Sequence, residues 1–467
     1  MIRAGLGAAL AVLLALTLGD ATLAAKPTAT PSAGPDTPRV AIPFEKYRLP
    51  NGLTVILHTD HSLPLVAVDV WYHVGPSNEP KGRSGFAHLF EHLMFEGSKH
   101  AGHEFDRLLE SVGATNSNGT TSWDRTDYFE TAARENLELL LWLESDRMGF
   151  MIDTLTQERL DVQRDVVKNE RRQSYENTPY GPSSLALMDA LFPEGHPYHG
   201  AIIGSMADLS AATLADVKDF FHAYYAPSNA TLTIAGDIDV AATKALITRY
   251  FGTLATRARP EQKPLPYTPL EKSARLVVDE PVALTQIAFG YRTPPAFSAD
   301  DPALEVTMAL LAGGKATRLY RRLVVDDKLA SDVSASVESN RLAGISTISA
   351  TLAGGKSSDK LEAEMNVALD ELAKKGPDAQ ELARAKRRIL LEILSSLELL
   401  NGPSGDSGRA GFLQHFDEYT GDPGYLTIWL QRIDGVSPSD VQRVVREHLK
   451  AEARAVVITR PVPEASP

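Results

Sequence analysis

The chain has 467 residues, of which 43% are hydrophobic and 23% are charged, and its formal net charge is -13. This composition is typical of a folded protein with two or three domains and excludes an intrinsically disordered chain. The negative charge argues against nucleic acid as the main partner, because phosphates would be repelled and the sequence shows no compact basic patch. Cysteine does not occur, so neither a disulfide framework nor lipoprotein attachment is available.

The N-terminal segment has the pattern of a secretory signal peptide. Arg3 supplies a positive charge, residues 4–18 form an apolar run, and small residues follow at 21–25. We therefore expect residues 1–25 to be a signal peptide and the mature chain to be periplasmic or secreted, with no membrane segment after cleavage. An uncleaved membrane anchor is the alternative, although the apolar run is shorter than the ~20 residues that a spanning helix needs.

Two proline-rich segments divide the rest of the chain. Residues 26–43 are rich in Pro, Thr, Ser and Ala and predict a flexible tether. A second break lies at residues 259–271, where several prolines remove backbone donors that a helix or sheet would use. We expect an N-terminal lobe at 44–258, an interlobe linker at 259–271, a C-terminal lobe at 272–460 and a tail at 461–467.

The two lobes repeat one order of predicted elements. The first has strands at 53–58 and 65–73, and then helices at 86–96 and 104–112, an extended segment at 120–131, and helices at 134–148 and 157–174. The second has strands at 275–279 and 285–291, and then helices from Pro302 and Thr317. Each closes with an apolar strand, at 229–235 and 453–459. The pattern predicts an α+β fold of two homologous α/β-sandwich lobes, each a mostly antiparallel sheet with packed helices.

A possible metal motif lies on the predicted helix 86–96. In the sequence His88-Leu-Phe-Glu91-His92, the two histidines are four residues apart and share one helical face, so they can ligate one metal while Glu91 flanks it. Such a pattern arises by chance in roughly a few per cent of chains with this composition. A catalytic zinc site takes three protein ligands, and Glu170 on the predicted helix 157–174 is the best candidate for the third.

Three segments, at 85–98, 113–128 and 164–170, resemble the pitrilysin family of inverzincin metallopeptidases, which includes the mitochondrial processing peptidase. The resemblance is to the zinc-bearing subunit of the short, two-lobe bacterial type. It implies a zinc endopeptidase with one Zn2+ per chain, held by His88, His92 and Glu170. Glu91 would be the general base that takes a proton from the metal-bound water.

The same resemblance implies how a substrate is bound. Segment 118–126 is similar to the edge strand on which family members hold peptides or small unfolded proteins in extended form. Asn118 and Gly119 stand where the family usually has Asn-Ala, and they would contact the substrate near the scissile bond. An ordinary strand with a polar turn is the alternative for these two residues.

The sequence departs from the family pattern at three positions. Gln163 replaces a Glu that usually supports the metal site, and a neutral amide does not compensate the metal's charge, so metal affinity or rate is expected to fall. Val324 and Ser331 stand where an Arg and a Tyr usually hold the substrate backbone. We therefore expect a metal-free homologous subunit to supply that pair in a heterodimer, with a homodimer less favoured. A noncatalytic binding or assembly subunit is the alternative function, but such members typically lose motif residues that this chain keeps.

Overall fold

The computed structural model describes residues 40–261 and 265–462. The predicted signal peptide, residues 26–39 of the predicted tether and residues 463–467 of the predicted tail lie outside these ranges. Within them, none of the helices combines the length and the apolar character needed to cross a membrane.

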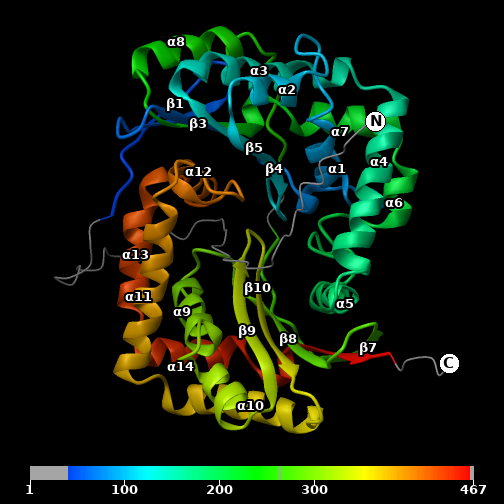
Figure 1. Ribbon diagram of the computed structural model, residues 1–467, viewed down its shortest axis with the longest axis vertical. Helices are drawn as coiled ribbons and strands as arrows, with labels where there is room; N and C mark the ends of the chain where they lie inside the picture. The colour runs from blue at the N-terminus through cyan, green and yellow to red at the C-terminus, as the bar shows by residue number, and fades with distance from the viewer. Residues whose placement is uncertain (1–39, 262–264, 463–467) are drawn as a thin grey trace.

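Two β-sheets, one in each half of the chain, lie one above the other (Figure 1). The first sheet has the order β1-β2-β6-β3-β5-β4, with bounds Glu45–Arg48, Thr54–Thr59, Ala230–Gly236, Leu65–Tyr72, Thr126–Ala133 and Thr115–Thr121. The second has the order β7-β11-β8-β10-β9, with bounds Ala274–Glu280, Ala455–Pro461, Gln286–Thr293, Gly344–Leu352 and Ala330–Ser339. The predicted α+β fold with two sheet-containing lobes is confirmed.

The two sheets share their strand order and directions. Among the described strands, the last strand of each half makes the one parallel pair of its sheet, β6 with β2 and β11 with β7, and the other pairs are antiparallel. Strands β2, β6, β3, β5 and β4 thus correspond to β7, β11, β8, β10 and β9. Strand β1 is an addition of the first sheet. The repeated order is the signature of a duplicated unit.

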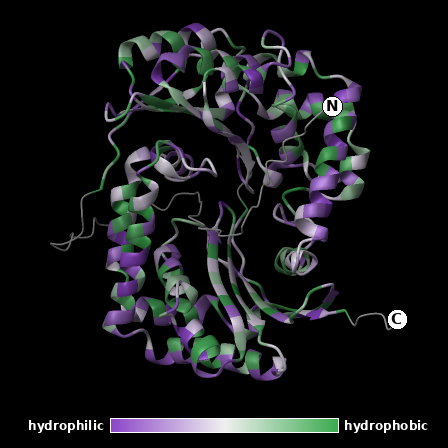
Figure 2. Cartoon of the chain, viewed as in Figure 1, coloured by the Kyte–Doolittle hydropathy of each residue, from purple (hydrophilic) through white to green (hydrophobic). Residues whose placement is uncertain are grey.

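Helices complete both halves. Those of the first are α1 (Phe86–Leu93), α2 (Phe105–Ser111), α3 (Leu137–Phe150), α4 (Gln157–Arg171), α5 (Gly181–Leu191), α6 (Met206–Ala211), α7 (Leu214–Tyr224) and α8 (Val240–Phe251). Those of the second are α9 (Asp301–Ala312), α10 (Ser358–Lys375), α11 (Ala379–Ser396), α12 (Gly408–Thr420), α13 (Leu426–Gly435) and α14 (Pro438–His448). Figure 2 shows hydrophilic and hydrophobic residues alternating along the outer helices, as expected of helices that bury one face. The predicted linker at 259–271 lies between α8 and β7, and the exact lobe boundaries stay a prediction.

Each sheet is covered on one face by a helix from the other half. The side chains of β3 alternate, so that Val66, Val68 and Val70 join the core of the first half, while Trp71 packs with Tyr419 of α12. Gln414 of α12 donates from Nε2 to the carbonyl of Asp69 at 2.9 Å. Helix α5 does the reverse and packs on the second sheet, where the side chains of Leu187 and Leu191 approach Gly290 of β8. The two halves therefore exchange helices.

Two hairpin turns also join the halves. The Asp124 Oδ2 atom, in the turn between β4 and β5, accepts from the backbone N–H of Arg341 at 2.9 Å and from the Tyr198 hydroxyl at 2.8 Å. Arg341 lies in the turn between β9 and β10. It forms an ion pair with Glu418, whose other oxygen lies 2.6 Å from Nδ1 of His73. These groups are buried, so the contact between the halves includes a polar network as well as apolar packing.

One local expectation was wrong, and two predicted helices have a feature that was not foreseen. The predicted extended segment 120–131 is a hairpin, in which β4 ends at Thr121, a turn follows, and β5 begins at Thr126. Thr and aromatic residues occur throughout the segment, including Trp123 in the turn itself, so composition alone did not reveal the turn. The helices expected to run to 174 and to start at Thr317 contain π-helical segments at Arg172–Glu176 and Tyr320–Asp326. Both segments are therefore helical as expected, and the local π-helical turns are the difference.

Candidate metal centre

Helix α1 presents its polar side chains on the face opposite to its core contacts. Phe86, Leu89, Phe90 and Leu93 are buried in the core of the first half. The start of the helix is held by Glu79, whose carboxylate oxygens accept the N–H groups of Gly85 and Ala87 at 2.8 Å each. Burial raises the pKa of Glu79 to about 8. The sequence analysis missed Glu79, because it lies too far before the helix for a capping-box pattern.

Helix α4 carries the third predicted residue to the same place. Leu160 and Val167 of α4 are buried, and Glu170 follows Val167 by three residues on a neighbouring part of the helix surface. The His92 Nε2 atom lies 3.2 Å from Glu170 Oε2, and the His88 Nε2 atom lies 3.7 Å from Glu170 Oε1. One ligand atom from each of the three residues lies within 4.8 Å of the others. The structure thus brings together His88, His92 and Glu170 from two helices.

This geometry fits a zinc ion. Tetrahedral zinc with bonds of about 2.1 Å places its ligand atoms about 3.4 Å apart. The observed separations of 3.2 and 3.7 Å bracket that value. Two imidazoles and one carboxylate are a donor set found in catalytic zinc sites, which keep one position open. Glu170 is 36% exposed, against 12% for His88, so the site is accessible from the side of the carboxylate.

The three groups shift one another's protonation. Burial lowers the pKa of His88, which favours the neutral imidazole that binds metals. At His92, burial acts to lower the pKa, but the hydrogen bond to Glu170 and the nearby carboxylates outweigh it and the pKa is raised. At Glu170, burial opposes ionisation, yet the hydrogen bond from His92 and the two histidines hold the pKa below its usual value. The carboxylate is therefore ionised at neutral pH.

Glu91 lies beside strand β4. The hydroxyl of Thr121 donates to Glu91 Oε2 at 2.6 Å. Gly119 faces the same way, since a Cβ at this position would lie 3.0 Å from Cγ of Glu91 and 3.1 Å from the ring of Phe95. Asn118 is exposed on β4. Thr121 was missed by the sequence analysis, although strand alternation puts residues 119 and 121 on one face.

Strand β4 is an edge of the first sheet. Among the described strands it pairs with β5 alone, so its other side presents unpaired backbone groups. The pairing has an irregularity between Thr115 and Asn118, next to Asn116, whose φ is 52°. The predicted edge position of Asn118 and Gly119 agrees with this order. The strand contacts α1, so the open edge lies next to the three-residue cluster.

A carboxylate stands behind Gln163. The Nε2 group of Gln163 donates to Glu96 Oε1, and the Gln163 side chain also hydrogen-bonds to His92. Gln163 thus lies between His92 and the Glu96 carboxyl group, and the expectation that its neutral amide lowers metal affinity or rate stays a prediction. Sequence analysis did not identify Glu96. Its link to Gln163 joins residues 67 positions apart and depends on how α1 and α4 pack.

The second half offers no equivalent of the Arg and Tyr pair at the predicted positions. Val324 lies in the π-helical segment and packs against the core of the second half. Ser331 lies in β9, where its hydroxyl donates to the Thr351 carbonyl at 3.3 Å.

Another cluster, of Asp300, Glu447 and His448, has the spacing of a metal site. However, Arg443 lies 2.7 Å from Asp300 Oδ1 and 3.2 Å from Glu447 Oε2. A guanidinium so placed already neutralises the carboxylates, and the cluster is an ion-pair network.

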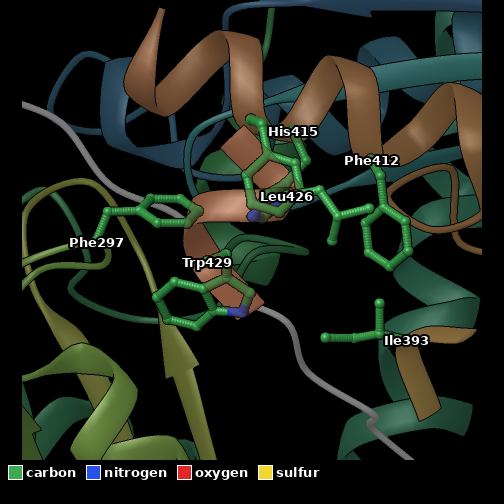
Figure 3. A pocket seen from close by; sticks show the side chains of 7 residues that line it. Phe297, Ile393, Phe412, His415, Leu426 and Trp429 are labelled. Atoms are coloured by element: carbon green, nitrogen blue, oxygen red, sulfur yellow. The ribbon is translucent and has the colours of Figure 1, made fainter. Parts of the chain in front are cut away.

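A small apolar pocket, partly open to solvent, lies among the helices of the second half (Figure 3). It is lined by Phe297, Ile393, Phe412, His415, Phe416, Leu426 and Trp429. These residues belong to α11, α12, α13 and the segment before α9, and none lies on α1, α4 or β4. The pocket is therefore separate from the three-residue cluster.

Comparison with known proteins identifies the family. Residues 54–191 match the family described as insulinase (peptidase family M16), and residues 211–389 match the peptidase M16 inactive domain. The chain is 32% identical over 427 residues to the zinc protease PqqE of Helicobacter pylori, an alignment that covers 89% of this chain and 93% of that protein.

Solved structures agree. The crystal structure of a protease from Helicobacter pylori has a TM-score of 0.82 and 30% sequence identity, covering 90% of this chain and all of the other. The periplasmic protease PqqL of Escherichia coli has the same fold with a TM-score of 0.73 and 19% identity, and the match covers 90% of this chain and 48% of PqqL. The chain belongs to peptidase family M16.

Proposed function

We propose that this protein is a zinc-dependent endopeptidase that hydrolyses peptides or small unfolded proteins bound as an extended strand. The observation that carries the proposal is the convergence of His88, His92 and Glu170 from two helices, with Glu91 beside them and an open sheet edge next to them. The assignment of the chain to family M16 and the name of its Helicobacter relative also support the proposal.

We assign His88, His92 and Glu170 as the ligands of one Zn2+. The bound ion would polarise a peptide carbonyl and lower the pKa of water to about 7. Glu91 is then the general base. Thr121 fixes its Oε2 atom by a hydrogen bond, so the rotation of the carboxyl group is set, and Oε1 is the oxygen that we assign to take up the proton and return it to the leaving amine.

Strand β4 is the proposed substrate strand. A peptide that pairs with its open edge is held by main-chain hydrogen bonds, which tolerate many sequences and require an extended, unfolded substrate. Asn118 and Gly119 lie on this strand beside Glu91, and we assign them as substrate contacts near the scissile bond. Because Gly119 has no side chain, the strand can approach Glu91 closely.

We also propose a partner subunit and an exported location. Val324 and Ser331 provide no Arg and Tyr to hold a substrate, so a metal-free homologue would supply them in a heterodimer, while a homodimer is less favoured. The match to PqqL covers 48% of that chain, so PqqL has room for a second unit of this size in its own polypeptide. In this protein a separate subunit would take that place. A periplasmic location is supported by the signal-like residues 1–25 and by the description of PqqL as periplasmic.

The alternative is a noncatalytic binding or assembly subunit. The match described as inactive covers residues 211–389, which contain none of the proposed ligands. The match to the peptidase domain covers residues 54–191, which contain the three ligands and Glu91. This division favours a catalytic first half with a metal-free second half.

The experiment compares the purified mature chain with its Glu91→Gln variant, with and without a copurifying partner. We expect about one zinc per chain in both proteins. Cleavage of an internally quenched peptide by the variant should be at least ~100-fold slower, because the general base is removed. Glu110→Gln, an exposed position on α2, is the matched control and should cleave normally.

Two outcomes would contradict the proposal. Absence of zinc from the wild-type chain would favour the noncatalytic alternative. Full hydrolysis by the homogeneous chain alone would leave the metal chemistry intact but remove the need for a partner.

A further inference from the structure

Strand β4 has a second neighbour besides helix α1. The loop of residues 401–407 connects α11 to α12 in the second half of the chain, and in Figure 1 the chain that leads into α12 lies close to β4. The proposed chemistry does not use this loop. Its contacts with the first half involve mainly β4, β5 and the turn between them, and Asn401 also lies beside Asp69 of β3.

Polar side chains of the hairpin bind carbonyl groups of the 401–407 loop. The Nδ2 group of Asn116 donates to the carbonyl of Asn401 at 3.1 Å and to that of Gly402 at 3.4 Å. The Thr120 hydroxyl lies 3.1 Å from the carbonyl of Ser404. Arg125 donates to the same carbonyl at 3.2 Å and forms an ion pair with Asp406 at 3.4 Å. Three successive parts of the hairpin are thereby tied to one loop.

Gly405 brings the loop against β5. Its φ is +72°, and a Cβ at this position would lie 1.5 Å from Oδ2 of Asp127. Asp127 is fully buried and binds both Thr120 and Arg125. Any side chain at position 405 must therefore displace the loop or the hairpin.

The two neighbours contact different residues of β4. Gly119 and Thr121 lie against Glu91 of α1, whereas Thr120, between them, binds the 401–407 loop. Alternation along a strand places these residues on opposite faces. One short edge strand is thus held between the helix that carries Glu91 and a loop from the other half.

We propose that the 401–407 loop is a positioning element for the active site, which sets the place of β4 relative to Glu91 and the metal ligands. The proposal rests on the assigned role of β4 as the substrate strand. It gives the metal-free half an indirect part in catalysis within its own chain. The loop acts through β4 and is not assigned a contact with the substrate.

The test compares Gly405→Ala with Gly421→Ala in the full mature chain. Both glycines have a positive φ, +72° and +77°, and flank α12, but a Cβ at Gly421 meets nothing within 4 Å. Backbone strain is therefore similar in the two variants, and only Gly405→Ala pushes on the hairpin. Hydrogen exchange of the amides of residues 115–121 is the first readout, because it needs neither zinc nor activity. We expect exchange at least about tenfold faster in Gly405→Ala and unchanged in Gly421→Ala.

Peptide cleavage is the second readout. A small displacement of a positioning strand is expected to lower kcat/KM roughly 10- to 100-fold, chiefly through a higher KM, with zinc content unchanged. Asn116→Asp is a second variant in case Gly405→Ala folds poorly. It keeps the shape of a residue that tolerates a φ of 52° but loses the donor to Asn401 and Gly402. Hydrogen exchange of the amides of residues 115–121 is expected to be faster in this variant too.

Equal exchange of residues 115–121 in Gly405→Ala, Asn116→Asp and wild type would overturn the proposal. So would equal losses of kcat/KM in Gly405→Ala and Gly421→Ala. If the wild-type chain shows no peptidase activity even together with its partner, while Gly405→Ala still frees β4, the proposed function fails and the structural link between loop and strand stands.

Discussion

The two halves of the chain use the same frame for different purposes. In the first, α1 packs against α4 and β4 and carries His88, Glu91 and His92. In the second, α9 packs against α11 and β9, the corresponding elements. There the facing side chains are apolar, with Leu304 and Leu311 on α9 and Ile389 and Ile393 on α11 all buried. Where the first half has the proposed metal ligands, the second half has hydrophobic core.

The carboxyl groups on these elements differ in their protonation between the two halves. Burial, together with the charges of Asp301 and Glu392, raises the pKa of Glu305 on α9 well above its usual value, so this group is neutral. Glu170 is also partly buried, but the histidines opposite it hold its pKa low. A cluster of charged and metal-binding groups is stable only where each has its partner. The first half therefore has polar, charged groups at a place where the second half has apolar packing.

The largest expected effect comes from removing the metal centre. Glu170→Ala leaves two ligands, and zinc binding is expected to weaken by more than ~100-fold, because even indirect supporting groups are worth 10- to 100-fold. Zinc per chain after dialysis and peptide cleavage measure this loss. Glu158→Ala, an exposed position on the same helix, should retain both. If Glu170→Ala kept its zinc, Glu170 would not be a metal ligand, and the proposed contrast between a metal-binding first half and an apolar second half would fail.

Weakening the polar network between the halves should have the next largest effect. Burial opposes ionisation of Glu418, but His73 and Arg341 outweigh it and lower its pKa from 4.5 to about 2. This ion therefore stabilises the fold above pH ~4.5 and loses its contribution as the pH falls towards 2. We expect Glu418→Gln to lower the free energy of unfolding by about 3–5 kcal/mol at pH 7, since buried cations lose their partner.

The urea midpoint, taken for both proteins at pH 7 and pH 3, checks this prediction. The difference between wild type and Glu418→Gln should shrink at pH 3. A difference that stayed constant between the two pH values would show that Glu418 does not act through its charge.

A smaller effect is expected at the start of α1. Glu79→Gln replaces one of two acceptor oxygens by a donor, which leaves the N–H of Gly85 or Ala87 without its partner and costs about 1–3 kcal/mol. Hydrogen exchange should rise in α1 and remain unchanged in α9, because the capping group belongs to the first half alone. Equal changes in the two helices would mean that the variant acts on the whole fold.

The smallest predicted effect concerns the charge behind Gln163. Glu96→Gln keeps a hydrogen-bonding group next to Gln163 but removes the negative charge. We expect zinc affinity to fall about tenfold, within the range for groups that support metal ligands. Competition with a chelator measures the affinity, and Glu110→Gln again serves as control. Unchanged affinity would show that the neutral amide of Gln163 is sufficient by itself.

Sequence predicted the parts of the molecule that depend on local spacing. The repeat of elements foretold two similar sheets, and the four-residue spacing of His88 and His92 put both on one face of a helix. Glu170 came from the resemblance together with its place on the predicted helix. Thr121, Glu96 and Glu79 were missed because each acts through a contact between elements that only packing brings together. The exchange of α5 and α12 was likewise beyond a local pattern.

The exchange of α5 and α12 affects the order in which this protein can be made. The first sheet is complete once β6 has left the ribosome, at residue 236, yet the helix that covers its second face ends only at residue 420. Until then Trp71 and its neighbours on that face lack their partners. Neither half can mature as a separate unit, and a nascent chain that stops in the second half leaves an exposed sheet for chaperones to bind.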